Sequence, residues 1–335
     1  MRKTLLLAVL LLGAFACAAT AFANPKVIKF SYGDPDNHFV FKALEDFKAI
    51  VEQDTGGSLK VELYPNAQLG DDREVLEALL LGQAEMVAPS PAVFASFVRP
   101  FNVLTFPFLF PDAETADTFA RSDTAKELYA MAESKGFVCL GIGAYGFRHV
   151  TNSKRPIMTI ADLKGLKIRT MENKVHLDTF RTLGANPTAM GWSEVLTGLQ
   201  QGTIDGQENP LPVVESTRLY EVQKYVSKTG HVYDWVVFVV RKSLWDSLTD
   251  MEKQALRKGA DAAHDRCARD AVQADLDTEK YLTDNKLIAI NEVSPEELAK
   301  MAEVTRPVLD KYISGVGKDF YKKVQDEIAA LRPAP

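Results

Sequence analysis

The order of strand-like and helix-like segments along the chain predicts an α/β fold, in which helices cover the faces of a sheet. Between residues 27 and 88, short apolar or alternating segments are separated by stretches whose apolar residues recur at helical spacing. The same order returns between residues 166 and 201. The composition agrees, because 46% hydrophobic and 25% charged residues over a length of 335 are typical of a globular protein with one large domain or two.

The first part of the chain predicts a β-α-β-α-β succession. Strands are expected at 27–30 and 59–63, where apolar residues are continuous or alternate with polar ones. Asn37 is expected to cap the helix between these strands. Asp71 is expected to cap a second helix, which is followed by a third short strand at 86–88.

The later part of the chain continues the alternation. A strand at 166–169 is followed by helices at 174–183 and 192–201. The run 232–240 is long and apolar, as expected of a strand that lies in a sheet core or crosses between domains.

Two long helices are predicted near the C-terminus. The capping box formed by Thr249 and Glu252 begins the first, which runs to about residue 284. Ser294 caps the second, and Pro295 stands in its first turn.

The N-terminus has the features of a secretory signal peptide. Arg2 and Lys3 precede an apolar run, and the A-x-A pattern at residues 21–23 is typical of a cleavage site. We therefore expect residues 1–23 to be removed and the mature chain to be periplasmic. An uncleaved anchor, or a lipoprotein site at Cys17, is the alternative. The formal net charge of −6 argues against a nucleic-acid partner, because no basic excess is present to neutralise phosphates.

The mature chain would retain two cysteines, Cys139 and Cys267. An exported protein could join them in a disulfide, because its compartment is oxidising. Nothing in the sequence places them close together, so two unpaired cysteines are the preferred interpretation.

Motifs for cofactors, metals and catalysis are missing or lack their context. A G-x-G-x-x-G pattern at 141–146 follows a strand, but another strand-like run follows it where a dinucleotide site needs a helix. We interpret these glycines as a flexible crossing between two lobes. The five histidines lack metal-ligand spacing, and no G-x-S-x-G motif is present. We therefore predict no cofactor, no metal and no catalytic residues.

Four segments carry a resemblance to a known family. They are Q-L-G-D-D-R at 68–73, I-A-D-L-K-G-L-K-I-R at 160–169, M-G-W-S-E-V at 190–195, and Q-G-T-I-D-G-Q-E-N-P at 201–210. Together they resemble the periplasmic solute-binding subunit of tripartite ATP-independent periplasmic (TRAP) transporters, the DctP-type family. The resemblance runs from about Val27 to the C-terminal helices, and the D-G-Q-E-N-P segment together with the K-I-R strand is a specific combination.

The resemblance implies a two-lobed binding protein without catalytic activity. Its two α/β lobes would enclose a ligand cleft and be joined by crossing strands and a long helix. The implied division is a signal peptide at 1–23, lobe I at 24–146 and 236–274, lobe II at 147–235 and 275–315, and a C-terminal helix and tail at 316–335 that packs on lobe I.

The resemblance also implies the ligand-binding residues. An organic acid would be held by Arg169 on the K-I-R strand. The other expected contacts are Arg148, Asn209, Trp192, Ser90, His38 and Trp235. The chemistry agrees for Arg169, because the planar guanidinium makes two parallel hydrogen bonds to a carboxylate and stays charged when it is desolvated.

Each of these assignments has a structural alternative. Arg169 could pair with a carboxylate such as Glu172, and Arg148 could form a salt bridge between the lobes. Aromatic residues in strands and at helix starts are usually core residues. Two acidic residues near Asn209, Asp205 and Glu208, are expected to serve loop or domain contacts, because a carboxylate aimed at an anion would repel it.

The predicted function is that of a periplasmic receptor for a small carboxylate or sulfonate of about two to six carbons. The receptor would deliver its ligand to the small and large membrane subunits of a TRAP transporter. A receptor for a bulkier or aromatic acid and a secreted enzyme acting on organic acids are the alternatives. A receptor for an ATP-driven importer and a binding protein that serves a signalling partner are further possibilities.

Overall fold

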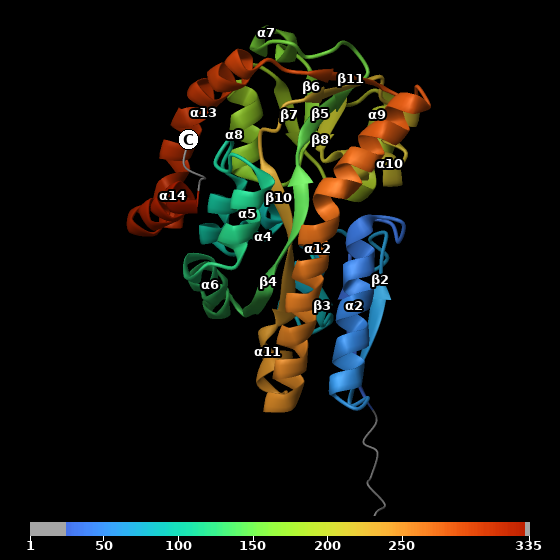
Figure 1. The fold of residues 1–335 in the computed structure, drawn as a ribbon, viewed down its shortest axis with the longest axis vertical. Helices are drawn as coiled ribbons and strands as arrows, with labels where there is room; N and C mark the ends of the chain where they lie inside the picture. Colours follow the sequence, from blue (N-terminus) through green and yellow to red (C-terminus); the bar gives the residue numbers. More distant parts are fainter. Residues whose placement is uncertain (1–24, 332–335) are drawn as a thin grey trace, which may run out of the picture.

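The computed structural model describes residues 25–331 and contains two β-sheets with helices around them (Figure 1). The first sheet has the strand order β2 (Leu59–Tyr64), β1 (Lys26–Ser31), β3 (Met86–Val87), β10 (Tyr233–Arg241) and β4 (Phe137–Phe147). The second has the order β11 (Ala289–Glu292), β9 (Tyr225–Lys228), β5 (His149–Asn152), β8 (Gly206–Asn209), β6 (Lys167–Thr170) and β7 (Asn186–Ala189). We call the part built on the first sheet lobe I and the part built on the second lobe II.

The helices follow the predicted alternation. Those of lobe I are α2 (Phe39–Asp54), α3 (Asp72–Leu80), α4 (Pro91–Phe94), η1 (Arg99–Thr105), α5 (Ala113–Ala120), α6 (Asp123–Ala130) and η2 (Glu133–Lys135). Those of lobe II are α7 (Ile160–Leu163), α8 (Lys174–Thr182), η3 (Trp192–Glu194), α9 (Val195–Gln201), α10 (Leu211–Ser216) and η4 (Leu219–Glu221). The chain ends with α11 (Lys242–Asp246), α12 (Asp250–Asp284), α13 (Pro295–Val316) and α14 (Lys318–Leu331).

Two strands and one helix join the lobes. Strand β4 of the first sheet leads through Arg148 directly into β5 of the second, and the chain returns at Tyr233 as β10, antiparallel to β4. Helix α12 packs on α2 and β4 of lobe I and also contacts α10 of lobe II, so it runs along both lobes (Figure 1). Helix α13 contacts η1 and α8, one from each lobe, while α14 lies against α5 and α6 of lobe I.

The glycine-rich segment 141–146 lies inside β4 and pairs with β10. The segment thus crosses towards the second lobe as part of a paired strand, and its flexibility stays a prediction. The glycines allow close packing and unusual backbone angles. A Cβ on Gly143 would lie 2.9 Å from the Cys267 sulfur on α12, and Gly146 has a φ of 115°. The absence of a helix after the motif agrees with the exclusion of a dinucleotide site.

The capping residues identified in the sequence predicted most helix starts correctly. The capping box of Thr249 and Glu252 begins α12, and the Ser294 side chain accepts from the Glu297 amide at the start of α13. At α2 the prediction is wrong by one residue. His38 is the cap, with Nδ1 accepting from the Val40 amide, while exposed Asn37 instead donates across to the Ser216 carbonyl of lobe II.

The core divides along with the lobes. One large apolar cluster fills lobe I, and two smaller clusters lie in lobe II. Cys139 and Cys267 are both buried and free, which confirms the interpretation of two unpaired cysteines. The predicted signal peptide lies outside the described residues. Within 25–331, no helix combines the length and apolar character needed to cross a membrane.

Candidate functional site

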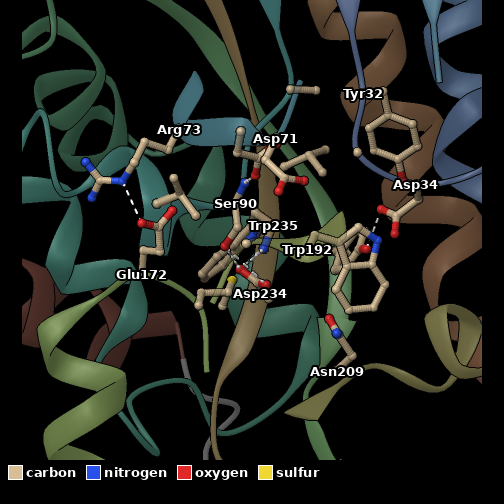
Figure 2. A pocket seen from close by; sticks show the side chains of 18 of the residues that line it. Tyr32, Asp34, Asp71, Arg73, Ser90, Glu172, Trp192, Asn209, Asp234 and Trp235 are labelled. Carbon is tan, nitrogen blue, oxygen red and sulfur yellow. Dashed lines mark hydrogen bonds and ion pairs between the residues drawn. The ribbon is translucent and has the colours of Figure 1, made fainter. Parts of the chain in front are cut away.

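A cavity of about 670 Å³, its opening to solvent included, lies where the two crossing strands pass between the lobes. The ends of β1, β3, β6 and β8 lead into it, as expected for sites at the carboxyl ends of strands in α/β folds. Figure 2 shows the side chains that surround it. Its polar and aromatic lining consists of Tyr32, Asp34, Asp71, Asp72, Arg73, Ser90, Tyr145, Arg148, Arg169, Glu172, Trp192, Asn209, Asp234 and Trp235.

Arg169 on β6 faces this cavity without an acidic partner. Its side chain is buried, and both Nε and Nη2 donate to the Met190 carbonyl, at 3.0 and 2.8 Å. The guanidinium carbon lies 5.4 Å from the centre of the Trp192 ring, within the range of a cation–π contact. Among the described residues, no carboxylate forms a salt bridge with Arg169. Its remaining N–H groups are therefore available to an anion.

The alternative partner for Arg169 is excluded by the structure. The Glu172 carboxylate accepts from Nε of Arg73 at 2.9 Å instead. Burial lowers the pKa of Arg169 to about 10, and neighbouring acidic groups offset only part of that effect. The guanidinium is still charged at neutral pH, in a place where water has largely been removed.

Arg148 also lines the cavity, but its donors are mostly occupied. Nε donates to the Glu208 carboxylate and Nη1 to the Asp234 carboxylate, each at 2.5 Å, and Nη2 donates to the Glu208 backbone carbonyl. Glu208 lies on β8 of lobe II and Asp234 on the crossing strand β10. All three side chains are buried. Although burial alone would raise it, the pKa of Glu208 is held well below its usual range by Arg148.

The other predicted residues divide into two groups. Ser90, Trp192, Asn209 and Trp235 line the cavity with the two arginines. His38 is absent from its lining, because this buried side chain lies behind Tyr32, whose hydroxyl is 2.8 Å from His38 Nδ1. The expected ligand contact of His38 is therefore not supported by its position.

Hydrogen bonds hold two of the lining residues in place. The Asn209 amide donates to Gln207 at 2.6 Å, and the Ser90 hydroxyl caps α4 and donates to Asp234 at 3.2 Å. Trp235 is almost fully buried and packs edge-on against Phe110. Its indole Nε1 is buried without a hydrogen-bond partner among the described residues.

Sequence reasoning missed an acidic wall on lobe I. The Asp34 carboxylate accepts from the Tyr145 hydroxyl at 2.6 Å, and the Asp72 carboxylate accepts from the Ser90 amide at 3.1 Å. Asp71 and Asp72 belong to one of the four family-like segments, so that segment was a usable signal. Asp34 follows the first strand of the chain and lies outside every motif identified in the sequence.

Comparison with known proteins agrees with this geometry. Residues 30–315 match the family described as bacterial extracellular solute-binding protein, family 7. This chain belongs to that family. It is therefore a binding protein rather than an enzyme, since the family consists of solute receptors. Within the described residues, no cluster of His, Cys, Asp or Glu is arranged to hold a metal ion.

Named relatives cover almost the whole chain. The C4-dicarboxylate-binding periplasmic protein DctP of Rhodobacter capsulatus is 33% identical over 92% of this chain and 93% of its own. The sugar acid binding protein DctPAm of Advenella mimigardefordensis, solved with galactonate, superposes with a TM-score of 0.88 at 33% identity over 92% of this chain and 99% of that one. A TRAP periplasmic solute-binding protein of Polaromonas sp. JS666, solved with D-erythronate, superposes with a TM-score of 0.85 at 33% identity. The match covers 90% of this chain and 98% of that one. The two-lobed α/β architecture expected from the resemblance is thereby confirmed.

The lobes of this family 7 protein touch each other across the cleft opening. The Asp71 carboxylate of lobe I accepts from the Ser193 hydroxyl of lobe II at 2.7 Å. The Arg73–Glu172 pair, which Figure 2 shows, joins the same two lobes. A Cβ on Gly191 would lie 2.4 Å from the Asp71 carboxylate, so this contact requires glycine there. The two lobes are therefore in direct contact at these positions.

Asp72 is the carboxyl group of the cavity lining whose pKa departs most clearly from its usual value. Burial raises its pKa to about 7, the hydrogen bond from the Ser90 amide opposes the rise, and Asp34, Asp71 and Asp234 add to it. The cationic groups in the same lining are Arg73, Arg148 and Arg169. The group is thus partly protonated at neutral pH.

The variant Asp72→Asn, without ligand, is expected to melt at a higher temperature than the wild type at pH 8. The folded-state pKa of Asp72 is about 7, above the unfolded value of about 3.9. The folded state therefore loses stability relative to the unfolded state as the pH rises from about 4 to about 7. An amide avoids this cost, so the difference should disappear near pH 4. Thermal melts across this pH range measure it. The exposed neighbour Asp36 provides the control Asp36→Asn, and equal melting of Asp72→Asn and wild type at both pH values would contradict the raised pKa.

Proposed function

We propose that this family 7 protein is the extracytoplasmic receptor of a TRAP transporter and binds a small organic acid through Arg169. One observation carries the proposal. Arg169 is a buried guanidinium that lines the cavity, donates to the Met190 carbonyl and has no carboxylate partner among the described residues. A buried charge that is unpaired is costly, so this arrangement is suited to an anionic ligand that supplies the missing partner.

Neighbouring side chains would orient the acid group. Trp192 lies over the Arg169 guanidinium and would cover one face of the ligand, while the Asn209 amide lies at the end of β8 on the same cavity wall. Arg148 has most of its donors on Glu208 and Asp234, so we assign it chiefly to holding β5, β8 and β10 together behind the ligand. Its free Nη1 hydrogen allows at most a single contact.

The proposed role includes export and delivery. Removal of residues 1–23 would release the receptor into the periplasm, where it would pass its ligand to the small and large membrane subunits. The solved relatives with galactonate and D-erythronate support a ligand of modest size. The aromatic side chains of the lining keep a bulkier or aromatic acid as the second candidate for the ligand.

A thermal-shift screen of the mature protein over carboxylates and sulfonates tests the proposal. A ligand that binds only the folded state raises the melting temperature, and the stabilisation grows with the logarithm of the ligand concentration relative to Kd. We expect at least one small organic acid to raise the melting temperature of the wild type and to raise that of Arg169→Ala much less at the same concentration. Turnover of an acid by the purified protein, or the absence of a melting-temperature shift with every acid of the screen, would contradict the proposal.

Ligand binding is expected to make the protein more compact. The lobes would open by rotation about the crossing strands near Gly146 and Val236, which separates Asp71 from Ser193 and Arg73 from Glu172. Small-angle scattering should therefore give a smaller radius of gyration with saturating ligand than without. Arg169→Ala in the same ligand is the control and should keep the larger radius. An unchanged radius in the wild type would rule out the hinged cleft.

A further inference from the structure

The cavity lining contains more acidic side chains than a site that binds only an anionic group would need. Five carboxylates and three arginines line it. Arg148 and Arg73 are each paired with carboxylates, which leaves Arg169 as the single arginine of the lining without one. Asp34 and Asp72 have no cationic partner among residues 25–331. The lining is therefore positive at one place and acidic at another.

These two features lie on opposite lobes. Arg169 belongs to β6 of lobe II, whereas Asp34 follows β1 and Asp72 begins α3 in lobe I. Gly33 lies beside the wall, because a Cβ on it would be 3.7 Å from Oδ1 of Asp72. A ligand held between the lobes would thus meet the guanidinium on one side and carboxylate oxygens on the other.

We infer that the cleft selects monocarboxylic acids that carry hydroxyl groups over dicarboxylic acids of the same length, with Asp34 and Asp72 as the specificity-determining residues. This inference rests on the proposed function. The ligand carboxylate takes Arg169, and the ligand hydroxyls donate to the acidic wall, because ionised carboxylates are pure acceptors. A second ligand carboxylate would instead meet like charges in a closed cleft, where their repulsion is poorly screened.

The lining also offers donors that hydroxyl groups satisfy. The buried indole Nε1 of Trp235 has no partner among the described residues, and the Asn209 amide lies in the same lining. A hydroxyl both donates and accepts, so one hydroxylated chain can pair with the acidic wall and with such donors. A plain alkyl chain would leave both sets of polar groups unsatisfied.

Hydroxyl groups fit the wall better than an ammonium group does. The Asp34 carboxylate already accepts a neutral hydroxyl, that of Tyr145. The pKa of Asp72 is raised to about 7 by burial and by Asp34, Asp71 and Asp234, so this group is partly a neutral carboxyl that can itself donate. A hydroxyl group can pair with either form of the Asp72 carboxyl, whereas an ammonium group only donates and finds no acceptor in the O–H of the protonated form.

Calorimetry with matched acids tests the inference. The six-carbon series is gluconate, hexanoate, adipate and 6-aminohexanoate, and the four-carbon series is erythronate, butyrate, succinate and 4-aminobutyrate. In at least one series we expect the hydroxy acid to bind about 100-fold or more tightly than the other three, since a site built to pair hydroxyl groups rejects analogues that lack them. Asp34→Asn and Asp72→Asn should each reduce the ratio of the affinities for the hydroxy acid and the dicarboxylate by about 10-fold. Asp36 is exposed and lies two residues from Asp34, so Asp36→Asn should leave this affinity ratio unchanged.

Lowering the pH gives a second readout for Asp72. Dicarboxylate binding should strengthen between pH 8 and pH 6 in the wild type, as Asp72 becomes protonated, and should lose this dependence in Asp72→Asn. A dicarboxylate or an amino acid that binds as tightly as its hydroxy acid would overturn the inference, as would Asn variants with unchanged selectivity. If no acid of either series binds the wild type or shifts its melting temperature, the failure lies with the proposed function instead.

Discussion

Arg169→Ala is expected to weaken ligand binding by about 30-fold to several thousand-fold. Removing one partner of a buried, hydrogen-bonded charge pair costs roughly 2–5 kcal/mol, and every 1.4 kcal/mol is about tenfold in affinity. The side chain is buried and, among the described residues, has no acidic partner, so the ligand's acid group would be its main counter-charge. Calorimetric titration of the acid found in the screen measures the loss.

Two further variants separate binding from folding. Arg169→Lys keeps the charge but loses the planar fork, so its affinity should lie between those of Arg169→Ala and the wild type. Arg306 is exposed on α13, and Arg306→Ala removes the same charge without an effect on affinity. Without ligand, Arg169→Ala should melt close to the wild type, since it loses the hydrogen bonds to the Met190 carbonyl and the contact with the Trp192 ring but no ion pair. Near-normal affinity in a strongly destabilised Arg169→Ala protein would show that the residue is structural.

Arg148→Ala is expected to act in the opposite way and lower the free energy of unfolding by about 3–5 kcal/mol. The substitution leaves the carboxylates of Glu208 and Asp234 buried and uncompensated, which is the costly way to break a buried ion pair. Urea unfolding of the protein without ligand measures the loss. The deficit should shrink at pH 5, because the stranded carboxylates of the folded variant, whose pKa values are then raised, take up protons.

A combined variant serves as the control for the Arg148 prediction. Adding Glu208→Gln and Asp234→Asn to Arg148→Met removes all three charges and should recover a large part of the lost stability, since replacing a whole buried ion network costs less than removing one member. If Arg148→Ala unfolds like the wild type but loses the ligand, Arg148 is a primary ligand contact and its assignment to the lobe junction is wrong.

The two arginines show why residues identified by the same reasoning have different roles. Both follow from a resemblance in short segments, and both line the cavity. The hydrogen bonds of Arg148 reach Glu208 and Asp234, 60 and 86 residues further along the chain, whereas the bonds of Arg169 end at a neutral carbonyl. Spacing in the sequence contains no information about which carboxylates fold onto which guanidinium.

The sequence by itself determined the local elements and much of the cleft lining. Helix caps such as Thr249 and Ser294 and the apolar run of β10 act through neighbouring residues, so their effect is visible in a short window. Six of the seven predicted ligand residues line the cavity, and three of them, Arg169, Trp192 and Asn209, belong to the family-like segments.

Only the tertiary structure decided the charge balance of the site. The acidic wall forms when the loop after β1, the start of α3 and strand β10 are brought together, which places Asp34, Asp72 and Asp234 in one lining. Pairing of β4 with β10 likewise turned the glycine motif into a strand, and packing placed His38 behind Tyr32. The physical reason is common to all three. Burial and electrostatic pairing depend on which distant segments come into contact, and those contacts set the pKa values and the free donors that a ligand meets.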